Sequence, residues 1–263
     1  MVIINGKVYG DNVTIVNGRV ITGKPCDDSA CKKFDETKKE SANGVNRITI
    51  DSNVNVKVST CDTNEITAHL HGSAIMDNDL ELSVTKRGDE IRVSVETDGV
   101  SNSYNNMSII SGNSIIFQSA VVINNFGSGS NGGLMLDVQI PAKAFEEISV
   151  ESTDANIDVS SSVNANSITA ESKNGNIDVS ATFQNLTVEC KNGNVDVDSE
   201  AYCNVKLNVT SKNGNVDVTI GNIGTSNVSV ASKNGNCKNN PKLRGIYTVS
   251  GCVTSKNGNA KFH

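Results

Sequence analysis

The chain has 263 residues, a formal net charge of −6, seven cysteines, no tryptophan and only 4% aromatic residues. No apolar run approaches the roughly 18 residues of a membrane-spanning helix, so no membrane span is expected, and neither is a nucleic-acid partner. An odd number of cysteines fits a reduced compartment better than a disulfide framework, and residues 1–6 lack the features of a signal peptide. The cytoplasm is therefore the predicted location, with the cell surface as the alternative if the native N-terminus is longer.

Residues 1–44 are predicted to form hairpin repeats followed by a charged loop. An Asn-Gly pair between β-branched residues occurs at 4–8 and again, twelve residues later, at 16–20. Such pairs are the strongest short-range signal for a hairpin, although two small coils would show the same pattern. Residues 23–44 are rich in Lys, Glu and Asp and have no sustained helical period. They are expected to form a solvated loop or a frayed helical turn.

Two cysteines of this charged segment, Cys26 and Cys31, flank four small or acidic residues. They are candidates for a disulfide or a metal site, with a plain pair of loop thiols as the alternative. Zinc would need two further ligands. The histidines, which are His69, His71 and His263, show no paired spacing that would supply them.

Residues 45–133 are expected to be a β-sheet, or the opening coils of a solenoid, followed by a loop rich in Asn, Ser and Gly. Polar and apolar residues alternate here with the period of two that marks a half-buried strand. The alternating stretches are 47–50, 54–58, 65–70, 80–84 and 90–95. The Asn-, Ser- and Gly-rich tract that follows is typical of a flexible loop or linker.

Residues 134–263 repeat one tetrapeptide, Lys-Asn-Gly-Asn, five times. The copies begin at Lys173, Lys191, Lys212, Lys233 and Lys256, so successive steps are 18, 21, 21 and 23 residues. An alternating strand precedes each copy and a shorter one follows most of them. Cys190 and Cys237 stand at positions where other repeats place small or apolar core residues, so both are predicted to be buried.

The regular period favours stacked coils over a meander of hairpins. A meander gives no reason for identical turns to recur every two strands with the same flanking pattern. In a stack, equivalent residues lie about 4.8 Å apart, and aligned Asn side chains can hydrogen-bond along the column. The predicted fold is therefore all-β: a β-solenoid, similar to a parallel β-helix, with coils of about 20 residues and an N-terminal hairpin or sheet region.

This layout resembles a bacterial putative adhesin family, a domain of unknown function with a β-solenoid core. The resemblance rests on the strand pair at 48–58, the stretch 136–141 and the serial units of the type Ser-Lys-Asn-Gly-Asn-Val-Asp-Val. It spans most of the chain and implies attachment to a cell surface. Fold-level analogy defines the architecture better than the function.

The strands after the Lys-Asn-Gly-Asn copies place one aspartate in each coil, and these would stack into an outward row of carboxylates. The row consists of Asp158, Asp178, Asp196 and Asp217. Hard cations such as calcium prefer several oxygen ligands, and paired carboxylates can cleave glycosidic bonds. The row is therefore a candidate calcium site or, alternatively, the centre of a polysaccharide-acting enzyme. The alternative without a functional role is that these aspartates simply occupy exposed strand positions.

Charge is distributed unevenly along the repeats. Residues 146–200 contain 11 acidic residues against two lysines, whereas residues 233–263 contain six basic residues and no acidic one. The basic residues are Lys233, Lys238, Lys242, Arg244, Lys256 and Lys261. Lysines at a sheet end can simply prevent edge-to-edge pairing. They could also form a basic end that binds an anionic partner or supports head-to-tail self-association.

The sequence predicts a non-catalytic scaffold for adhesion or interaction. No nucleophile–base pair and no phosphate-binding loop before a helix is found, so neither a catalytic site nor a cofactor is expected. The predicted partner is an unknown protein or a surface glycan. The competing class is an enzyme or a cation-binding protein that uses the aspartate row.

Overall fold

The structure, a computed structural model, describes residues 2–4, 7–9, 13–16, 19–22, 32–74, 80–97 and 133–263. Cys26 and Cys31 lie outside these residues, as does most of the Asn-, Ser- and Gly-rich tract. All regular elements in the described part are strands. Near the N-terminus, β1 (Val2–Ile4) pairs antiparallel with β2 (Lys7–Tyr9), and β3 (Val13–Val16) with β4 (Arg19–Thr22), which confirms the two hairpins.

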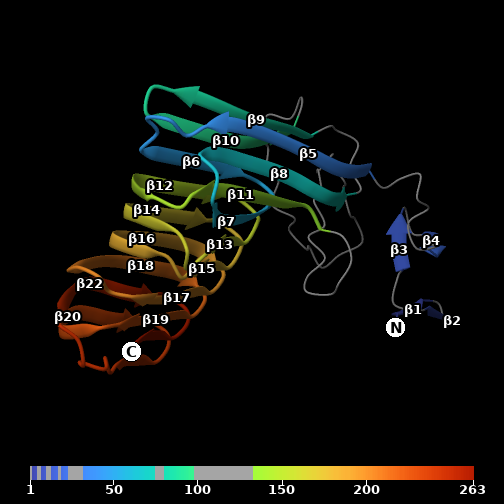
Figure 1. Ribbon diagram of the computed structural model, residues 1–263. Coiled ribbons are helices and arrows are strands. Elements are labelled where there is room, and N and C mark those ends of the chain that lie inside the picture. Colours follow the sequence, from blue (N-terminus) through green and yellow to red (C-terminus); the bar gives the residue numbers. More distant parts are fainter. Residues whose placement is uncertain are drawn as a thin grey trace.

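Two large sheets form the body of the molecule and continue from one end of the stack to the other (Figure 1). In spatial order, the nine-stranded sheet consists of β20 (Ile223–Ser232), β22 (Tyr247–Ser255), β18 (Val205–Asn213), β16 (Thr182–Asn192), β14 (Asn164–Ser172), β12 (Ala144–Ser152), β6 (Arg47–Ser52), β10 (Glu90–Thr97) and β9 (Leu80–Arg87). The ten-stranded sheet consists of β21 (Cys237–Asn239), β23 (Ala260–Phe262), β19 (Val216–Gly221), β17 (Val195–Glu200), β15 (Ile177–Val179), β13 (Ile157–Val159), β7 (Asn55–Cys61), β11 (Met135–Pro141), β8 (Glu65–Ala74) and β5 (Lys32–Ser41).

Each repeat forms one coil, which confirms the predicted solenoid. A long strand lies in the nine-stranded sheet, the Lys-Asn-Gly-Asn segment forms the corner, and a short strand lies in the ten-stranded sheet. Successive coils pair in parallel, so that Ile168 lies beside Leu186 in one sheet and Asp178 beside Asp196 in the other. The apolar residues of both sheets face inward and form a single continuous core from Ala42 to Phe262.

The two asparagines of the corner motif have different partners. The first forms the predicted side-chain column: Asn192 donates from Nδ2 to Oδ1 of Asn174, and Asn213 donates to Asn192, both at 2.6 Å. The second accepts a hydrogen bond from the backbone of the next coil, as when the amide of Asn194 donates to Oδ1 of Asn176 at 2.9 Å. Each corner is therefore joined to the adjacent coil by two kinds of hydrogen bond, one between Asn side chains and one from a backbone amide to an Asn side chain.

The corner glycine is needed because the backbones of adjacent coils approach closely, not because the corner has a positive φ. Among the residues that the structure describes, the glycines with φ in the left-handed region are Gly44, Gly72, Gly88 and Gly251, and none of these lies at a corner. A Cβ atom at Gly193 would lie 2.1 Å from the carbonyl oxygen of Gly175 in the neighbouring coil. Glycine is the residue that permits such an approach of two backbones.

At both ends of the stack, the order in which the coils lie in space differs from their order along the sequence. The last coil of the chain, β22 and β23, lies between β18/β19 and β20/β21. Accordingly, Asn257 donates to Asn213 at 2.6 Å, and Asn234 donates to Asn257 at 2.7 Å. At the other end, β6 and β7 lie between β10/β11 and β12/β13. The penultimate repeat, not the last one, forms the end of the solenoid.

Strand β5 corrects the prediction of a charged loop or helical turn over this part of 23–44. It pairs antiparallel with β8 along ten residues and forms the edge of the ten-stranded sheet. Alternate residues from Phe34 to Glu40 are half-buried while those between are exposed. Three of these four half-buried residues, Glu36, Lys38 and Glu40, have long charged side chains, so the sequence lacks the alternation of apolar and polar residues that marks a strand. Charged edge strands discourage pairing with other chains.

The two predicted core cysteines have different environments. Cys190 is buried as predicted, and its thiol donates to the carbonyl oxygen of Gly175 at 3.3 Å. Burial raises the pKa of the Cys190 thiol, which suppresses the reactive thiolate. Cys237 is exposed, so its predicted burial was wrong. It lies in β21, the end strand of the sheet, where no further coil covers it.

Candidate functional site

A groove of about 540 Å³ runs across the corners of successive coils. One wall is a row of carboxylates that are direct neighbours in the parallel register, formed by Asp51, Glu151, Glu171 and Glu189. The other wall is a row of corner lysines, formed by Lys173, Lys191, Lys212 and Lys256. The two rows arise because outward positions two residues apart on a strand, such as Glu189 and Lys191 of β16, face the same side.

The groove changes from acidic to basic along its length. At the β6 and β12 end, Asp51 and Glu151 line it without a lysine, because Thr153 occupies the first corner. The next two coils each supply one glutamate and one lysine. Beyond them, Thr210 replaces the glutamate while Lys212 and Lys256 continue the basic wall. Burial, followed by repulsion from Glu151 and Glu189, raises the pKa of Glu171.

The predicted aspartate row is one continuous row on the outer face of the ten-stranded sheet. Asp158, Asp178, Asp196 and Asp217 are register neighbours in that order. Both ends are neutralised: Lys57 Nζ lies 4.0 Å from Asp158, and Lys261 Nζ lies 3.4 Å from Asp217. His263 Nε2 also lies 3.3 Å from Asp217. The two central carboxylates, Asp178 and Asp196, face each other across one strand spacing.

The central aspartates are electrostatically strained. Burial, together with repulsion from neighbouring aspartates, raises the pKa of both Asp178 and Asp196. A row also offers a cation few oxygens at any one point, whereas calcium takes six to eight. Within the described residues, the one group of three metal-binding side chains close enough to share an ion lies elsewhere.

Asp178→Asn is expected to stabilise the protein by roughly 0.5 kcal/mol at pH 7, because it relieves repulsion between adjacent strands. A raised folded-state pKa means that the ionised form costs stability. That cost is fully present above the raised pKa and disappears as the pH falls to the ordinary value of 3.8. Urea midpoints should therefore differ between wild type and variant at pH 7 and converge below about pH 4.

Asp217→Asn is the matched control. From the sequence alone, relief of repulsion within the aspartate row predicts a near-neutral or slightly stabilising effect, but the structure pairs Asp217 with Lys261 and His263. This variant should therefore lose a few tenths of a kcal/mol, because half-exposed ion pairs contribute little. A loss above about 1 kcal/mol for Asp178→Asn would contradict the repulsion and indicate a cation bound in the row.

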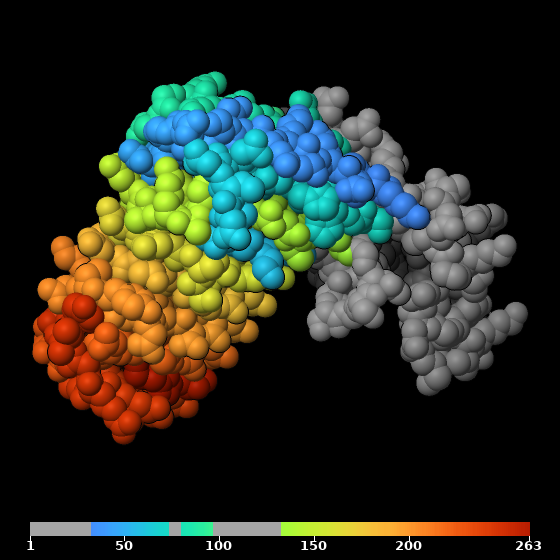
Figure 2. Space-filling view, in the orientation of Figure 1, coloured from blue at the N-terminus to red at the C-terminus, as the bar shows by residue number. Residues whose placement is uncertain are grey.

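The six residues of the predicted basic end occupy different surroundings. Lys256 lines the groove and Lys261 pairs with Asp217. The other four belong to the terminal coil and the segment after it, and these are Lys233, Lys238, Lys242 and Arg244. Two large apolar side chains, Leu243 and Ile246, are exposed beside them. The C-terminal segments, red in Figure 2, form the end of the stack opposite β5, β8 and β9.

One further cluster, formed by His69, His71 and Asp137, is not among the sites predicted from the sequence. The statement that the histidines lack paired spacing was wrong, because residues two apart on a strand project from the same face. The signal was the tripeptide His-Leu-His inside an alternating stretch. Asp137 could not be found this way, since it comes from β11 and only the sheet register brings it beside β8.

Two sheets of parallel coils with an uninterrupted core define a β-solenoid protein. The chain belongs to the Toastrack DUF4097 family, whose model matches residues 45–254. In the part of the chain that the structure describes, no helix has the length and hydropathy needed to cross a membrane.

Solved structures with similar folds have low sequence identity to this chain. A putative cell adhesion protein from Clostridium sporogenes superposes with a TM-score of 0.50 at 14% identity, over 88% of this chain and 99% of that one. A putative adhesin from Bacteroides fragilis gives 0.40 at 12% identity, over 86% and 98% of the two chains. No match was found among curated proteins.

Proposed function

We propose that this chain is a non-catalytic, adhesion-type scaffold that binds an acidic polysaccharide along its groove. The observation that supports this most directly is the pair of charged rows, repeated from coil to coil with the spacing of the strands. A surface that repeats the same groups at a fixed interval suits a partner that also repeats. An extended polymer with regularly spaced carboxylates has this property.

The chemistry of the two walls fits an acidic glycan. The lysine wall offers ammonium groups to carboxylates of the polymer, and the glutamate wall offers acceptors for its hydroxyl groups. Neutral glycans are usually bound on aromatic faces, which are scarce in a chain with 4% aromatic residues. Recognition through charge needs no such face, so the composition is compatible with this partner.

The enzyme alternative finds less support. The aspartate row that it would use does not line the groove. The two central carboxylates, Asp178 and Asp196, have similar surroundings, because burial and neighbouring aspartates raise the pKa of both, whereas glycoside hydrolysis needs two carboxyl groups with distinct roles. The Clostridium sporogenes protein is described as a putative cell adhesion protein, which is the same class of function.

The test is isothermal titration calorimetry, in which the full chain is titrated with polygalacturonate at 50 and at 500 mM salt. Binding should weaken strongly at the higher salt, because the Debye length falls from roughly 14 Å to 4 Å. The double variant Lys191→Glu/Lys212→Glu, in the middle of the lysine wall, should weaken binding at least tenfold. That factor corresponds to about 1.4 kcal/mol.

The matched control is Lys238→Glu/Lys242→Glu, which makes the same change of net charge outside the groove. It should bind as the wild type does. If this control loses binding while the groove variant keeps it, the basic end is the site and the groove proposal fails. Sedimentation at 50 mM salt tests head-to-tail self-association in the same samples. A polymer that binds neither wild type nor control would overturn the glycan proposal.

A further inference from the structure

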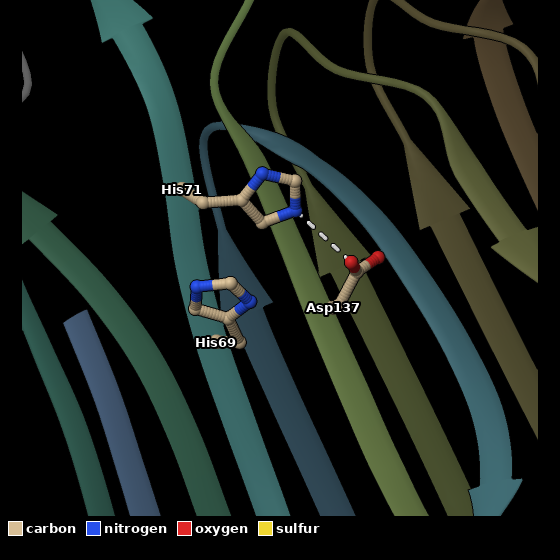
Figure 3. Close-up of side chains that lie close together, drawn as sticks. All are labelled: His69, His71 and Asp137. Atoms are coloured by element: carbon tan, nitrogen blue, oxygen red, sulfur yellow. Dashed lines mark hydrogen bonds and ion pairs between the residues drawn. The ribbon is translucent and has the colours of Figure 1, made fainter. Parts of the chain in front are cut away.

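Three side chains of types that can bind a metal ion project from the outer face of the ten-stranded sheet near its β5 end. His69 and His71 come from β8 and Asp137 from the neighbouring strand β11, and the three point toward one another (Figure 3). His71 Nε2 lies 3.0 Å from Asp137 Oδ2, and the two imidazole rings stack at 4.6 Å between centroids. One donor atom from each residue lies within 4.8 Å of the others.

The sheet register explains why these three residues meet. His69 is the direct cross-strand partner of Asp137, and His71 is two residues further along the same face. All three side chains are a little over one-third exposed, between 37% and 38%. The cluster is therefore accessible to an ion from solvent, and its strands hold the backbone positions of the three donors in place.

The donor set selects a class of metal. Two imidazoles and one carboxylate suit zinc and its neighbours in the first transition row better than calcium or magnesium, which prefer oxygen alone. With metal–nitrogen bonds of about 2.0–2.1 Å, tetrahedral ligands lie roughly 3.3 Å apart. The His71–Asp137 pair already has nearly this separation, at 3.0 Å. The donor atoms of all three residues already lie within 4.8 Å of one another, so rotation of the side chains is enough to bring them to this spacing.

A second carboxylate supports the site from the edge strand. His69 Nε2 lies 2.8 Å from Oδ1 of Asp35 in β5. Histidines that bind metals usually donate their second ring N–H to a carboxylate, which fixes the tautomer and increases the basicity of the ligand nitrogen. If Nε2 of His69 donates to Asp35, Nδ1 carries the lone pair for the metal. Asp35 is thus a positioning residue.

We propose that His69, His71 and Asp137 bind one divalent transition-metal ion of the zinc class, with Asp35 orienting His69. Three protein donors leave at least one coordination position open, as in sites where the ion also binds water or an external ligand. This site is separate from the proposed glycan groove, because none of its residues lines that groove.

The test is calorimetric titration of the full, chelator-treated chain with Zn²⁺. We expect each chain to bind one Zn²⁺ ion with high affinity, and the double variant His69→Ala/His71→Ala to lose this binding. Asp137→Asn should weaken Zn²⁺ binding at least tenfold. Asp35→Asn should weaken it less, because Asp35 acts through His69. Titration with Co²⁺ gives a second readout, since the absorption spectrum reports the ligand type and coordination geometry.

Two control variants decide whether the binding belongs to this cluster. His263→Ala removes a histidine that faces Asp217 and should leave Zn²⁺ affinity unchanged. Cys26→Ser/Cys31→Ser should also leave it unchanged, and the Co²⁺ spectrum should lack thiolate charge-transfer bands. The proposal is overturned if the His69/His71 variant binds as the wild type does, if the cysteine variant abolishes binding, or if the wild type binds only at millimolar Zn²⁺. Circular dichroism verifies that each variant is folded.

Discussion

Gly214→Ala is expected to lower the free energy of unfolding by about 3 kcal/mol, toward the upper end of the usual cost of overpacking. A Cβ atom at this corner would lie 1.9 Å from the carbonyl oxygen of Gly193 and 2.5 Å from its carbonyl carbon. These are backbone atoms of the next coil, so no side-chain rotation relieves the clash. The reduction should appear as a lower urea midpoint of the far-ultraviolet circular dichroism signal.

The corner cannot simply move away, because hydrogen bonds hold it from both sides. Asn213 donates to Asn192 in one neighbouring coil and accepts from Asn257 in the other, each at 2.6 Å. Any shift that makes room for the methyl group must lengthen one of these bonds or separate the coils. The same argument applies to every internal Lys-Asn-Gly-Asn corner, which explains why the glycine recurs in each copy.

Gly221→Ala is the matched control for this substitution. The three atoms nearest to a Cβ there would be those of the Glu200 carboxylate group, at 2.3–2.4 Å, and this flexible side chain can rotate away. The expected loss is below about 1 kcal/mol. Equal losses at Gly214 and Gly221 would show that coil spacing does not constrain the corner, and the account of the repeated glycine would fail.

The repeating part of this fold can be predicted from the sequence, because the pattern of residues within each repeat determines which side chains face inward and which residues stack. Alternation between apolar and polar residues defines the inward face, and the period places Asn174, Asn192 and Asn213 in one column. The aspartate row follows from the same register. Each of these features depends only on a position within the repeat, which one sequence is enough to reveal.

The order of coils could not be predicted, because nearly identical repeats can stack on one another equally well. Nothing in the motif indicates that Lys256 lies beside Lys212 while Lys233 is displaced to the end of the stack. The groove depends on this order, since Lys256 extends its basic wall. The exposure of Cys237 has the same origin: it belongs to the coil that becomes the end of the solenoid.

Features formed between segments distant in sequence were also beyond prediction. The His69–Asp137 pairing joins residues on β8 and β11, and the contact of His69 with Asp35 adds a third strand. Strand β5 itself was hidden, because its half-buried positions carry charged residues such as Glu36 and Lys38. A pattern based on hydrophobicity cannot detect an edge strand of this composition.

Val209→Asp is expected to have the largest effect of any substitution considered, a loss of about 4 kcal/mol or more that is close to the total stability of many domains. Val209 has no exposed surface and lies in β18 between Val188 and Val253 of the adjacent coils, which are equally buried. A carboxylate there would be surrounded by apolar side chains without a cation or a hydrogen-bond donor to compensate it.

Two comparisons separate the contributions to this loss. Val209→Ala removes the packing without adding a charge and should lose roughly 2 kcal/mol, so the remainder measures the buried carboxylate. Asn208→Asp introduces a carboxylate one residue away on the exposed face and keeps the oxygen that accepts from Cys252, so its urea midpoint should change little. Because burial raises the pKa of a carboxyl group, the Val209→Asp loss should be larger at pH 7 than at pH 4. Similar midpoints for the Asp substitutions at 208 and 209 would contradict the assignment of β18 residues to inner and outer faces, on which the solenoid core and the charged rows both depend.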